Sequence, residues 1–179
     1  MTSQVATLGD RARLLGLQDL ALAEAQDFLA TVEVGGDNRG PAVELFQKLG
    51  GDTVGEAWCA DFVNAVVQIA TGKKNERSPL EAIRRQAYVQ DYVDWANREG
   101  RIIPAHHAEP GDLFALLFPS KGRYAHIGFV FDPPRDGQFS TIEGNTDDEA
   151  SREGIKVASR VRDVTDGTVF FTWAREARS

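Results

Sequence analysis

The stretch GEAWCADFVNAVVQIATG, residues 55–72, holds the only cysteine of the chain, Cys59, at the start of an apolar helical run. Its apolar residues recur at three- and four-residue spacing, which predicts a helix over residues 58–71 that stops at Gly72. On a helical wheel, Cys59 lies in the middle of the apolar stripe. Free cysteines are often core residues, but a thiol in the first turn of a helix is also favoured as a thiolate by the helix dipole. The helix alone therefore leaves two interpretations of Cys59 open, an inert core thiol and a nucleophile.

Helices dominate the first hundred residues, and strands dominate the remainder. Three further helices are predicted: residues 17–33, a short helix from Pro41 to the KLGG at 48–51, and residues 79–97, closed by Gly100. After them come short runs rich in β-branched and aromatic residues, at 112–118, 126–131, 138–143, 155–161 and 168–174. Helices followed by strands indicate an α+β fold, with an antiparallel sheet of about five strands packed on the helix that carries Cys59.

The composition excludes several classes of protein. With 179 residues the chain is long enough for one compact domain and short for two. Lys and Arg total 20 against 27 Asp and Glu, and this net charge of −7 gives no reason to expect nucleic acid or an anionic membrane surface as a partner. No run approaches the roughly 18 consecutive apolar residues that a membrane span requires.

The N-terminal residues are typical of an amphipathic helix and not of a signal peptide, because polar residues interrupt the leucines at Gln18, Asp19, Glu24 and Asp27. A single cysteine forms no internal disulfide, so the sequence carries no mark of an oxidising compartment. We therefore expect synthesis and folding in the cytoplasm without a signal peptide.

Of the three histidines, His126 is the candidate base. His106 and His107 lie in the loop sequence IIPAHHAEPG and are interpreted as solvated loop residues. His126 begins the run HIGFVF, which the turn sequence DPPRDG joins to QFSTIEG. A hairpin with a four-residue loop over 133–136 would place His126 directly opposite Glu143, on the same face, with Cβ atoms about 4.5–5.5 Å apart.

The same register would place Val130 opposite Phe139, and a change of one residue in loop length would destroy it. With this pairing, one ring nitrogen of His126 binds the Glu143 carboxylate and the other is free to take a proton from a thiol. Asn145 keeps to the same side if the strand continues. A thiol, a base and a group that orients the base are the requirements of nucleophilic catalysis. The alternatives are a hydrogen-bonded core histidine and a strand-end carboxylate in solvent, but the combination favours catalysis.

Four segments in this order resemble the CHAP family of cysteine- and histidine-dependent amidohydrolases and peptidases, which cut peptidoglycan. They are GEAWCADFVNAVV, EPGDLFALLF, AHIGFVF and TIEGNTDD, and NRGPAVELFQKLGG resembles the lead-in of the phage-lysin-like branch. The resemblance covers roughly residues 20–175 of a single catalytic domain. It implies a papain-like fold in which Cys59 is the nucleophile, His126 the general base and then acid, and Glu143 the group that orients the imidazole. It also implies that Asn145 assists the histidine or the oxyanion.

The backbone N–H of Cys59 is expected to meet the oxyanion at the helix N-terminus. Many members of the family carry a glutamine just upstream of the cysteine, where this chain has Glu56, Ala57 and Trp58. The second oxyanion donor is thus open, with the Trp58 indole as one candidate; alternatively, Trp58 is a wall of the substrate groove.

No metal and no cofactor are expected. Some members of the family bind calcium in an acidic loop ahead of the cysteine, but here that region offers only Asp37, Asn38 and Asp52, fewer than the roughly six to eight oxygen ligands that calcium takes. The polar segment NTDDEASREG, residues 145–154, is interpreted as a solvated surface loop, with a loop over one end of the cleft as the alternative.

The resemblance implies hydrolysis of an amide in the peptide part of peptidoglycan, by an N-acetylmuramoyl-L-alanine amidase or a peptidoglycan endopeptidase. Delivery to the periplasm or cell wall would need a holin, a phage-tail-like apparatus or a secretion machine. An antibacterial effector of this kind would have a cognate immunity protein as a partner. The rival interpretations are a papain-like cysteine hydrolase acting on a non-wall amide and a non-catalytic binding or structural module that retains the fold.

Overall fold

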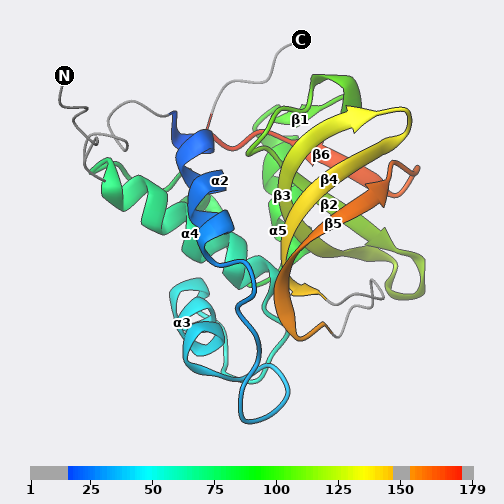
Figure 1. The fold of residues 1–179 in the computed structure, drawn as a ribbon. Helices are drawn as coiled ribbons and strands as arrows, with labels where there is room; N and C mark the ends of the chain where they lie inside the picture. Colours follow the sequence, from blue (N-terminus) through cyan, green and yellow to red (C-terminus); the bar gives the residue numbers. More distant parts are fainter. Residues whose placement is uncertain (1–15, 147–153, 175–179) are drawn as a thin grey trace, which may run out of the picture.

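The helix α4 (Cys59–Lys73) packs against two other helices and the sheet in the computed structural model, which describes residues 16–146 and 154–174 (Figure 1). The other helices within these ranges are α2 (Leu17–Asp27), α3 (Pro41–Gly50), α5 (Val89–Arg98) and three short 3-10 helices, η1 (Pro79–Ala82), η2 (Ala105–His107) and η3 (Pro119–Lys121). Of the helices so described, none has the length and hydrophobicity needed to cross a lipid bilayer.

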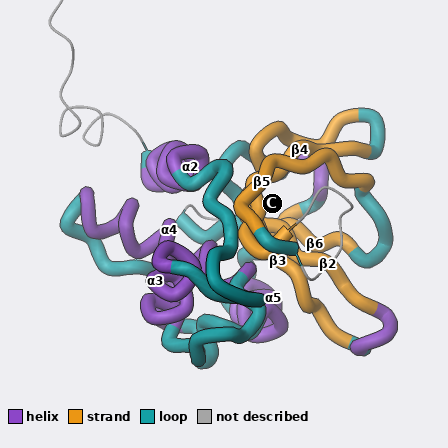
Figure 2. The backbone as a smooth tube through the Cα atoms, turned by 60° about the horizontal axis from the view of Figure 1, so that its bottom comes forward, coloured by secondary structure: helices purple, strands orange, loops and turns teal. Residues whose placement is uncertain are grey.

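The strands form one antiparallel sheet in the order β1-β6-β2-β3-β4-β5. Figures 1 and 2 show α2, α3 and α4 on one side of the molecule and the curved sheet on the other. The chain is therefore an α+β protein, as predicted, but the sheet has six strands because the two-residue strand β1 was not foreseen. The strands are β1 (Ile102–Ile103), β2 (Leu113–Phe118), β3 (Arg123–Arg135), β4 (Gln138–Thr146), β5 (Lys156–Asp163) and β6 (Thr168–Phe171).

The caps of α3 and α4 follow from their sequences. Gly40 and Pro41 begin α3, and Gly51, with a φ of 78°, ends it in the left-handed region that glycine favours. α4 begins at Cys59, one residue later than predicted, and reaches Lys73. These two predictions are confirmed to within the usual uncertainty of helix ends.

The predicted helix over 17–33 is wrong in its last turn and a half. α2 stops at Asp27, and the chain turns at Ala30, whose φ is 68°. The residues that follow run beside β5, where Val32 bridges Lys156 and the Glu33 N–H donates to the Ile155 carbonyl at 2.8 Å. Backbone hydrogen bonds to the edge of the sheet thus replace those of the helix. The part of the expected N-terminal helix at 1–15 lies outside the described residues.

The predicted helix over 79–97 is also wrong, because it breaks into η1 and α5. Ser78 caps η1 through its hydroxyl, and Ile83 is extended. The intervening residues make tertiary hydrogen bonds instead of helical ones: Gln86 Nε2 donates to the Leu80 carbonyl at 3.0 Å, and the Tyr92 hydroxyl donates to the Gln86 carbonyl at 2.7 Å. The break leaves residues 83–88 as a loop, and this loop lines the cleft described below.

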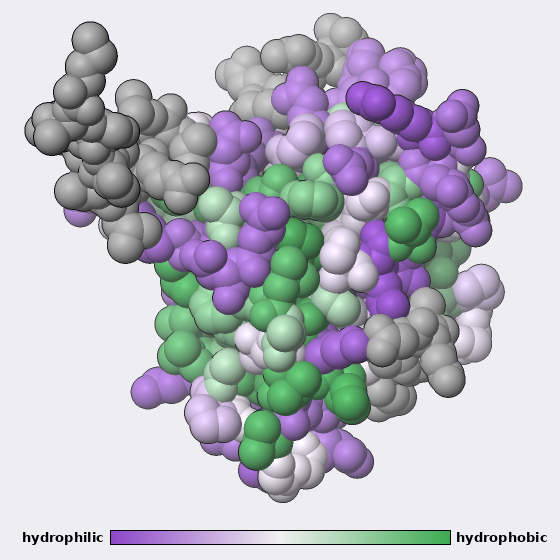
Figure 3. Space-filling model, viewed as in Figure 1, coloured by the Kyte–Doolittle hydropathy of each residue, from purple (hydrophilic) through white to green (hydrophobic). Residues whose placement is uncertain are grey.

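α4 is buried along nearly its whole length, between α2 and α3 on one side and β3 and β4 on the other. The ring of Phe62 lies 5.5 Å from that of Phe46 and 6.2 Å from that of Phe129, in edge-to-face contacts that join α3, α4 and the sheet. A second apolar cluster on the other face of the sheet includes Phe114 and Phe139. On the surface seen in Figure 3, hydrophilic side chains predominate over the hairpin of β3 and β4, and apolar ones gather towards the helices.

Gly144 of β4 marks the closest approach of the sheet to α4. A Cβ built there would lie 2.6 Å from the Phe62 Cβ and 2.8 Å from the Trp58 ring. Gly144→Ala is therefore expected to lower the free energy of unfolding by about 1–3 kcal/mol through overpacking, measured by chemical denaturation. Gly72→Ala is the matched control, because nothing lies within 4 Å of a Cβ in that helical position. We expect the control to be neutral or to stabilise by up to about 1 kcal/mol, and equal effects of the two changes would contradict the packing argument.

Candidate active site

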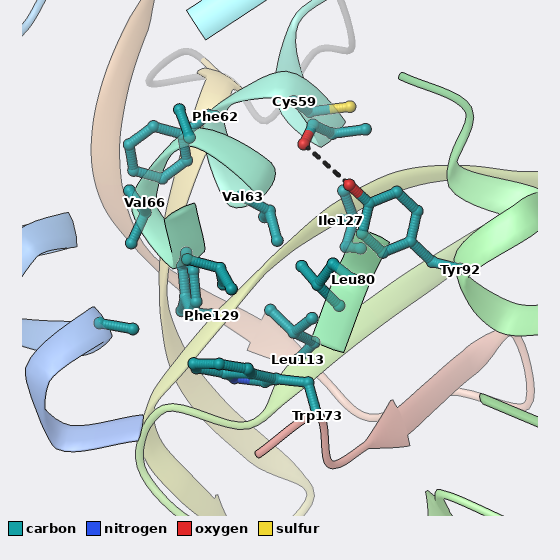
Figure 4. Close-up of a cluster of buried hydrophobic side chains, with 14 of the residues drawn as sticks. Cys59, Phe62, Val63, Val66, Leu80, Tyr92, Leu113, Ile127, Phe129 and Trp173 are labelled. Carbon is teal, nitrogen blue, oxygen red and sulfur yellow. Dashed lines mark hydrogen bonds between the residues drawn. The ribbon is translucent and has the colours of Figure 1, made fainter. Parts of the chain in front are cut away.

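Cys59 is the first residue of α4 and is 5% exposed. Figure 4 shows it at the edge of the apolar cluster, with its sulfur directed away from Phe62. Trp58, with φ −110° and ψ 19°, forms the N-cap without a side-chain hydrogen bond to the helix. The first N–H groups of a helix have no acceptor within the helix, so this end of α4 presents donors and partial positive charge to the thiol.

His126 on β3 and Glu143 on β4 form the centre of the site. His126 Nε2 lies 2.7 Å from Glu143 Oε2, and the two side chains are 3% and 0% exposed. The ring of His126 packs beside Phe114, with centroids 6.4 Å apart. Because Nε2 is bound to the carboxylate, Nδ1 is the nitrogen left for Cys59. The expected pairing of these two residues is therefore found, and Glu143 is buried, not in solvent.

The register that led to this pairing is wrong by two residues. Val130 pairs with Thr141 and not with Phe139, and Arg135 pairs with Gln138. The turn is thus two residues long, Asp136 and Gly137 with φ 51° and 79°, and two irregularities in β3 absorb the extra residues. A shift of two preserves the face of every side chain, whereas a shift of one would have reversed it.

Gly128 makes room for Glu143 to reach His126 along the strand. A Cβ built on Gly128 would lie 2.9 Å from the Glu143 Cγ and 2.9 Å from the Phe114 ring. With the shifted register, Glu143 lies diagonally from His126 and must cross the space over residue 128. The absence of a side chain at Gly128 therefore permits the 2.7 Å contact.

Arg162 on β5 and Thr141 on β4 complete the binding of Glu143, and sequence reasoning missed both. Arg162 makes a two-point ion pair, with Nε 2.8 Å from Oε1 and Nη2 2.5 Å from Oε2. The Thr141 hydroxyl donates to Oε1 at 2.6 Å. Arg160 and Arg162 alternate with smaller side chains in the sequence of β5, which indicates a shared face, but no pattern shows that this face meets Glu143.

Two opposing effects set the charges of this pair. Burial alone would lower the pKa of His126, but the charge of Glu143 and hydrogen bonding with Cys59 and Glu143 outweigh burial and raise the pKa to about 9. Burial would raise the pKa of Glu143, but Arg162 and His126 hold that pKa well below its usual range. At neutral pH the pair is therefore imidazolium and carboxylate. His126 therefore presents a positive charge to Cys59.

Asn145 is brought to the same end of β4 and is 1% exposed. Its φ of 53° lies in the left-handed region, and its Oδ1 has no hydrogen-bond partner among the described residues. A buried amide oxygen without a partner costs free energy, which makes the position of Asn145 unusual for a purely structural residue. The loop expected over 145–154 lies mostly at 147–153, outside the described residues.

Trp58 does not take the role expected of it. It is 0% exposed, so it cannot form a wall of an open groove, and its indole N–H donates to Glu33 Oε1 at 2.9 Å. Its ring stacks on Phe46, with centroids 5.8 Å apart. Trp58 is thus a core residue that fixes the start of α4, and its indole is not the missing oxyanion donor.

Asp61, in the first turn of α4, is a buried acid that sequence reasoning also missed. Neither of its oxygens has a hydrogen-bond partner among the described residues, and it packs against Gly50. Burial and the charge of Asp52 raise the pKa of Asp61 to about 8, so the group is mostly protonated at neutral pH. The adjacent Tyr92 hydroxyl lies 3.3 Å from the Ala60 carbonyl, which is the dashed line in Figure 4. These contacts pack the first turn of α4 tightly around Cys59.

A cleft of about 730 Å³ opens beside this turn. Its lining comes from the segment 50–57, which leads into Cys59, from the loop 83–88, and from Arg123 on β3. The lining stops at Ala57, two residues before the thiol, and Arg123 lies three residues before His126. The cleft thus lies beside the segments that lead into Cys59 and His126, although neither of these two residues lines it.

Within the described ranges, no group of three or more His, Cys, Asp or Glu side chains is arranged to hold a metal ion. His106 and His107 lie in η2, with ring centroids 4.3 Å apart.

Comparison with known proteins adds little to this description. No protein-family model matches the chain, and no curated protein matches it. Among solved structures, the chain is similar to one described as the crystal structure of Ly7917, with 12% identity and a TM-score of 0.38. The similarity covers 88% of this chain and 62% of the other, so this chain spans less than two thirds of the length of that solved structure. A likeness this distant carries no argument about family or activity, and the function must be inferred from the site.

Proposed function

We propose that this protein is a cysteine amidohydrolase that cleaves an amide bond in the peptide part of peptidoglycan. The observation that carries the proposal is the buried Cys59–His126–Glu143 arrangement at the start of α4, with the carboxylate held by Arg162. The choice of a cell-wall amide as the substrate rests on the resemblance of the four sequence segments to the CHAP family.

In the proposed reaction, the Cys59 thiolate attacks the carbonyl carbon of the amide and forms a C–S bond. The backbone N–H of Cys59 donates to the oxyanion that develops. As the C–N bond breaks, the leaving amine takes its proton from His126, and a thioester remains on Cys59. His126, now neutral, takes a proton from water, whose oxygen attacks the thioester and releases the carboxylic acid and the thiolate.

Glu143 orients the imidazole and keeps it charged between turnovers. Its carboxylate accepts from His126, Thr141 and Arg162, so it has no freedom to rotate away. Asn145, with its unpartnered amide oxygen at the end of β4, is proposed as the residue that assists the histidine or the oxyanion.

Purified sacculi from several wall types test the proposal. They are incubated with the wild-type protein and with Cys59→Ala, and the soluble fragments are analysed by mass. We expect fragments from the wild type alone, with masses that distinguish cleavage next to muramic acid from cleavage within the stem or cross-bridge. Absence of fragments from every wall type, with a folded protein, would overturn peptidoglycan as the substrate and favour another amide or a binding role.

A further inference from the structure

The cleft beside Cys59 has an uneven distribution of charge. The loop 83–88 and the start of β3 contribute three arginines to its lining, Arg84, Arg85 and Arg123. Arg85 is neutralised by Asp91, with Nε–Oδ2 and Nη2–Oδ1 distances of 2.8 and 2.7 Å. Arg84 and Arg123 make no salt bridge with any described residue. In a chain with a net charge of −7, two guanidinium groups without a salt bridge therefore lie at one cleft.

Tyr88 holds two of the three arginines, Arg85 and Arg123, in place. The guanidinium carbon of Arg123 lies 4.5 Å from the centroid of the Tyr88 ring, and that of Arg85 lies 4.1 Å from the same centroid. Arg123 Nη1 also donates to the Tyr124 carbonyl at 3.2 Å. Stacking and this hydrogen bond restrict the side chain of Arg123, so less conformational entropy is lost when it binds a ligand. The charged group is thus oriented before the ligand arrives.

The arginines lie near the segments that carry the proposed reacting residues. Arg123 and His126 share the strand β3, and the cleft reaches Ala57 on the segment that leads into Cys59. A ligand that binds beside the arginines and extends past Ala57 would bring its amide towards the thiol. Guanidinium groups bind carboxylates by paired hydrogen bonds, and a cleft strengthens the field of such charges.

We propose that Arg84 and Arg123 form a carboxylate-binding subsite that selects substrates with a free carboxylate close to the amide that Cys59 attacks. The inference rests on the proposed function, because it takes the amide to be part of a cell-wall peptide. Asp52 and Glu56 also line the cleft and repel an anion, so the carboxylate is confined to the part formed by the arginines.

The test compares binding of two soluble muropeptides that differ at one group, a free carboxylate in one and a carboxamide in the other. Binding is measured calorimetrically with Cys59→Ala, which cannot turn the peptides over. We expect the carboxylate peptide to bind about 10-fold more tightly, the ratio that one good charged contact supplies. Adding Arg84→Gln and Arg123→Gln together should reduce the ratio to about 2-fold or less.

Two further variants serve as controls, one for general loss of positive charge and one for loss of folding. Arg77→Gln removes an exposed arginine outside the cleft lining, and it should leave the ratio unchanged. Arg123→Lys keeps the charge, so it should retain part of the preference if Arg123→Gln fails to fold.

Equal affinity for the two peptides, no binding of either, or a preference that survives loss of both arginines would overturn the subsite. The digestion of sacculi by the wild type reports separately on the proposed function. Digestion without a carboxylate preference would refute only the subsite. A preference without digestion would refute only the cell-wall substrate.

Discussion

Replacing Cys59 by serine is expected to lower kcat/KM for the proposed cell-wall amide by on the order of 10⁴-fold or more, with the fold intact. The reason lies in the charge of the base. In the wild type His126 has a pKa of about 9, to which Cys59 itself contributes, so the imidazole is protonated at neutral pH. The proposed reaction starts from a thiolate, and an alcohol ionises far less readily than a thiol beside an imidazolium. The site is thus suited to a sulfur nucleophile and unsuited to an oxygen nucleophile.

The measurement is the initial rate on a soluble muropeptide, with thermal unfolding as the check on folding. Because Cys59 is the only cysteine, iodoacetamide modifies a single position, and the modified fraction of the wild type should equal the fraction of activity lost. Cys59→Ala sets the background rate. A serine variant that keeps more than about one hundredth of the wild-type rate, or full activity after complete alkylation, would refute the nucleophilic role.

Glu143→Gln is expected to have the largest effect on stability, a loss of about 3 kcal/mol or more in the free energy of unfolding. The substitution keeps the size of the side chain but removes the charge that faces His126 and Arg162. Breaking a buried ion pair leaves its partner uncompensated, and here two cations lose one anion. Hydrolysis should also fall, on the order of 10²-fold or more, because the imidazole is no longer held charged and oriented.

The pH dependence of stability distinguishes this electrostatic cause from simple loss of packing. The pKa of His126 is raised from 6.5 to about 9, so its stabilising contribution is complete below pH 6.5 and is lost as the pH rises through 9. Urea denaturation of the wild type should show this loss, and Glu143→Gln should not. Glu81→Gln is the matched control, since it removes an exposed pair with Arg77 that is worth less than about 1 kcal/mol. Identical pH profiles for the wild type and Glu143→Gln would contradict the assignment.

The elements that could be predicted from the sequence are those whose signals are local. The glycine and proline at the ends of α3 and the apolar spacing of α4 depend on a few neighbouring residues, and both helices form where expected. The helix over 79–97 failed because hydrogen bonds from Gln86 and Tyr92, made with residues several positions away, override its helical pattern. A local pattern contains no information about such partners.

In the candidate site, too, features set by local sequence could be predicted and features set by distant partners could not. The pairing of His126 with Glu143 was found despite a wrong turn, because alternation along a strand tolerates an error of two residues. Trp58 was misinterpreted because its partner Glu33 is brought to it only by the path of the chain after α2. Arg162 was not found at all, since which face of β5 meets β4 is decided by pairing between distant segments.

The ion pairs of Glu143 join three neighbouring strands, with His126 on β3, Glu143 on β4 and Arg162 on β5. A ribosome completes β5 only after it has synthesised the thiol, the imidazole and the carboxylate, so a nascent chain contains every reacting group before the group that fixes their charges. Under the proposed function, the charges that hydrolysis needs are therefore fixed only once the last strands of the sheet are in place.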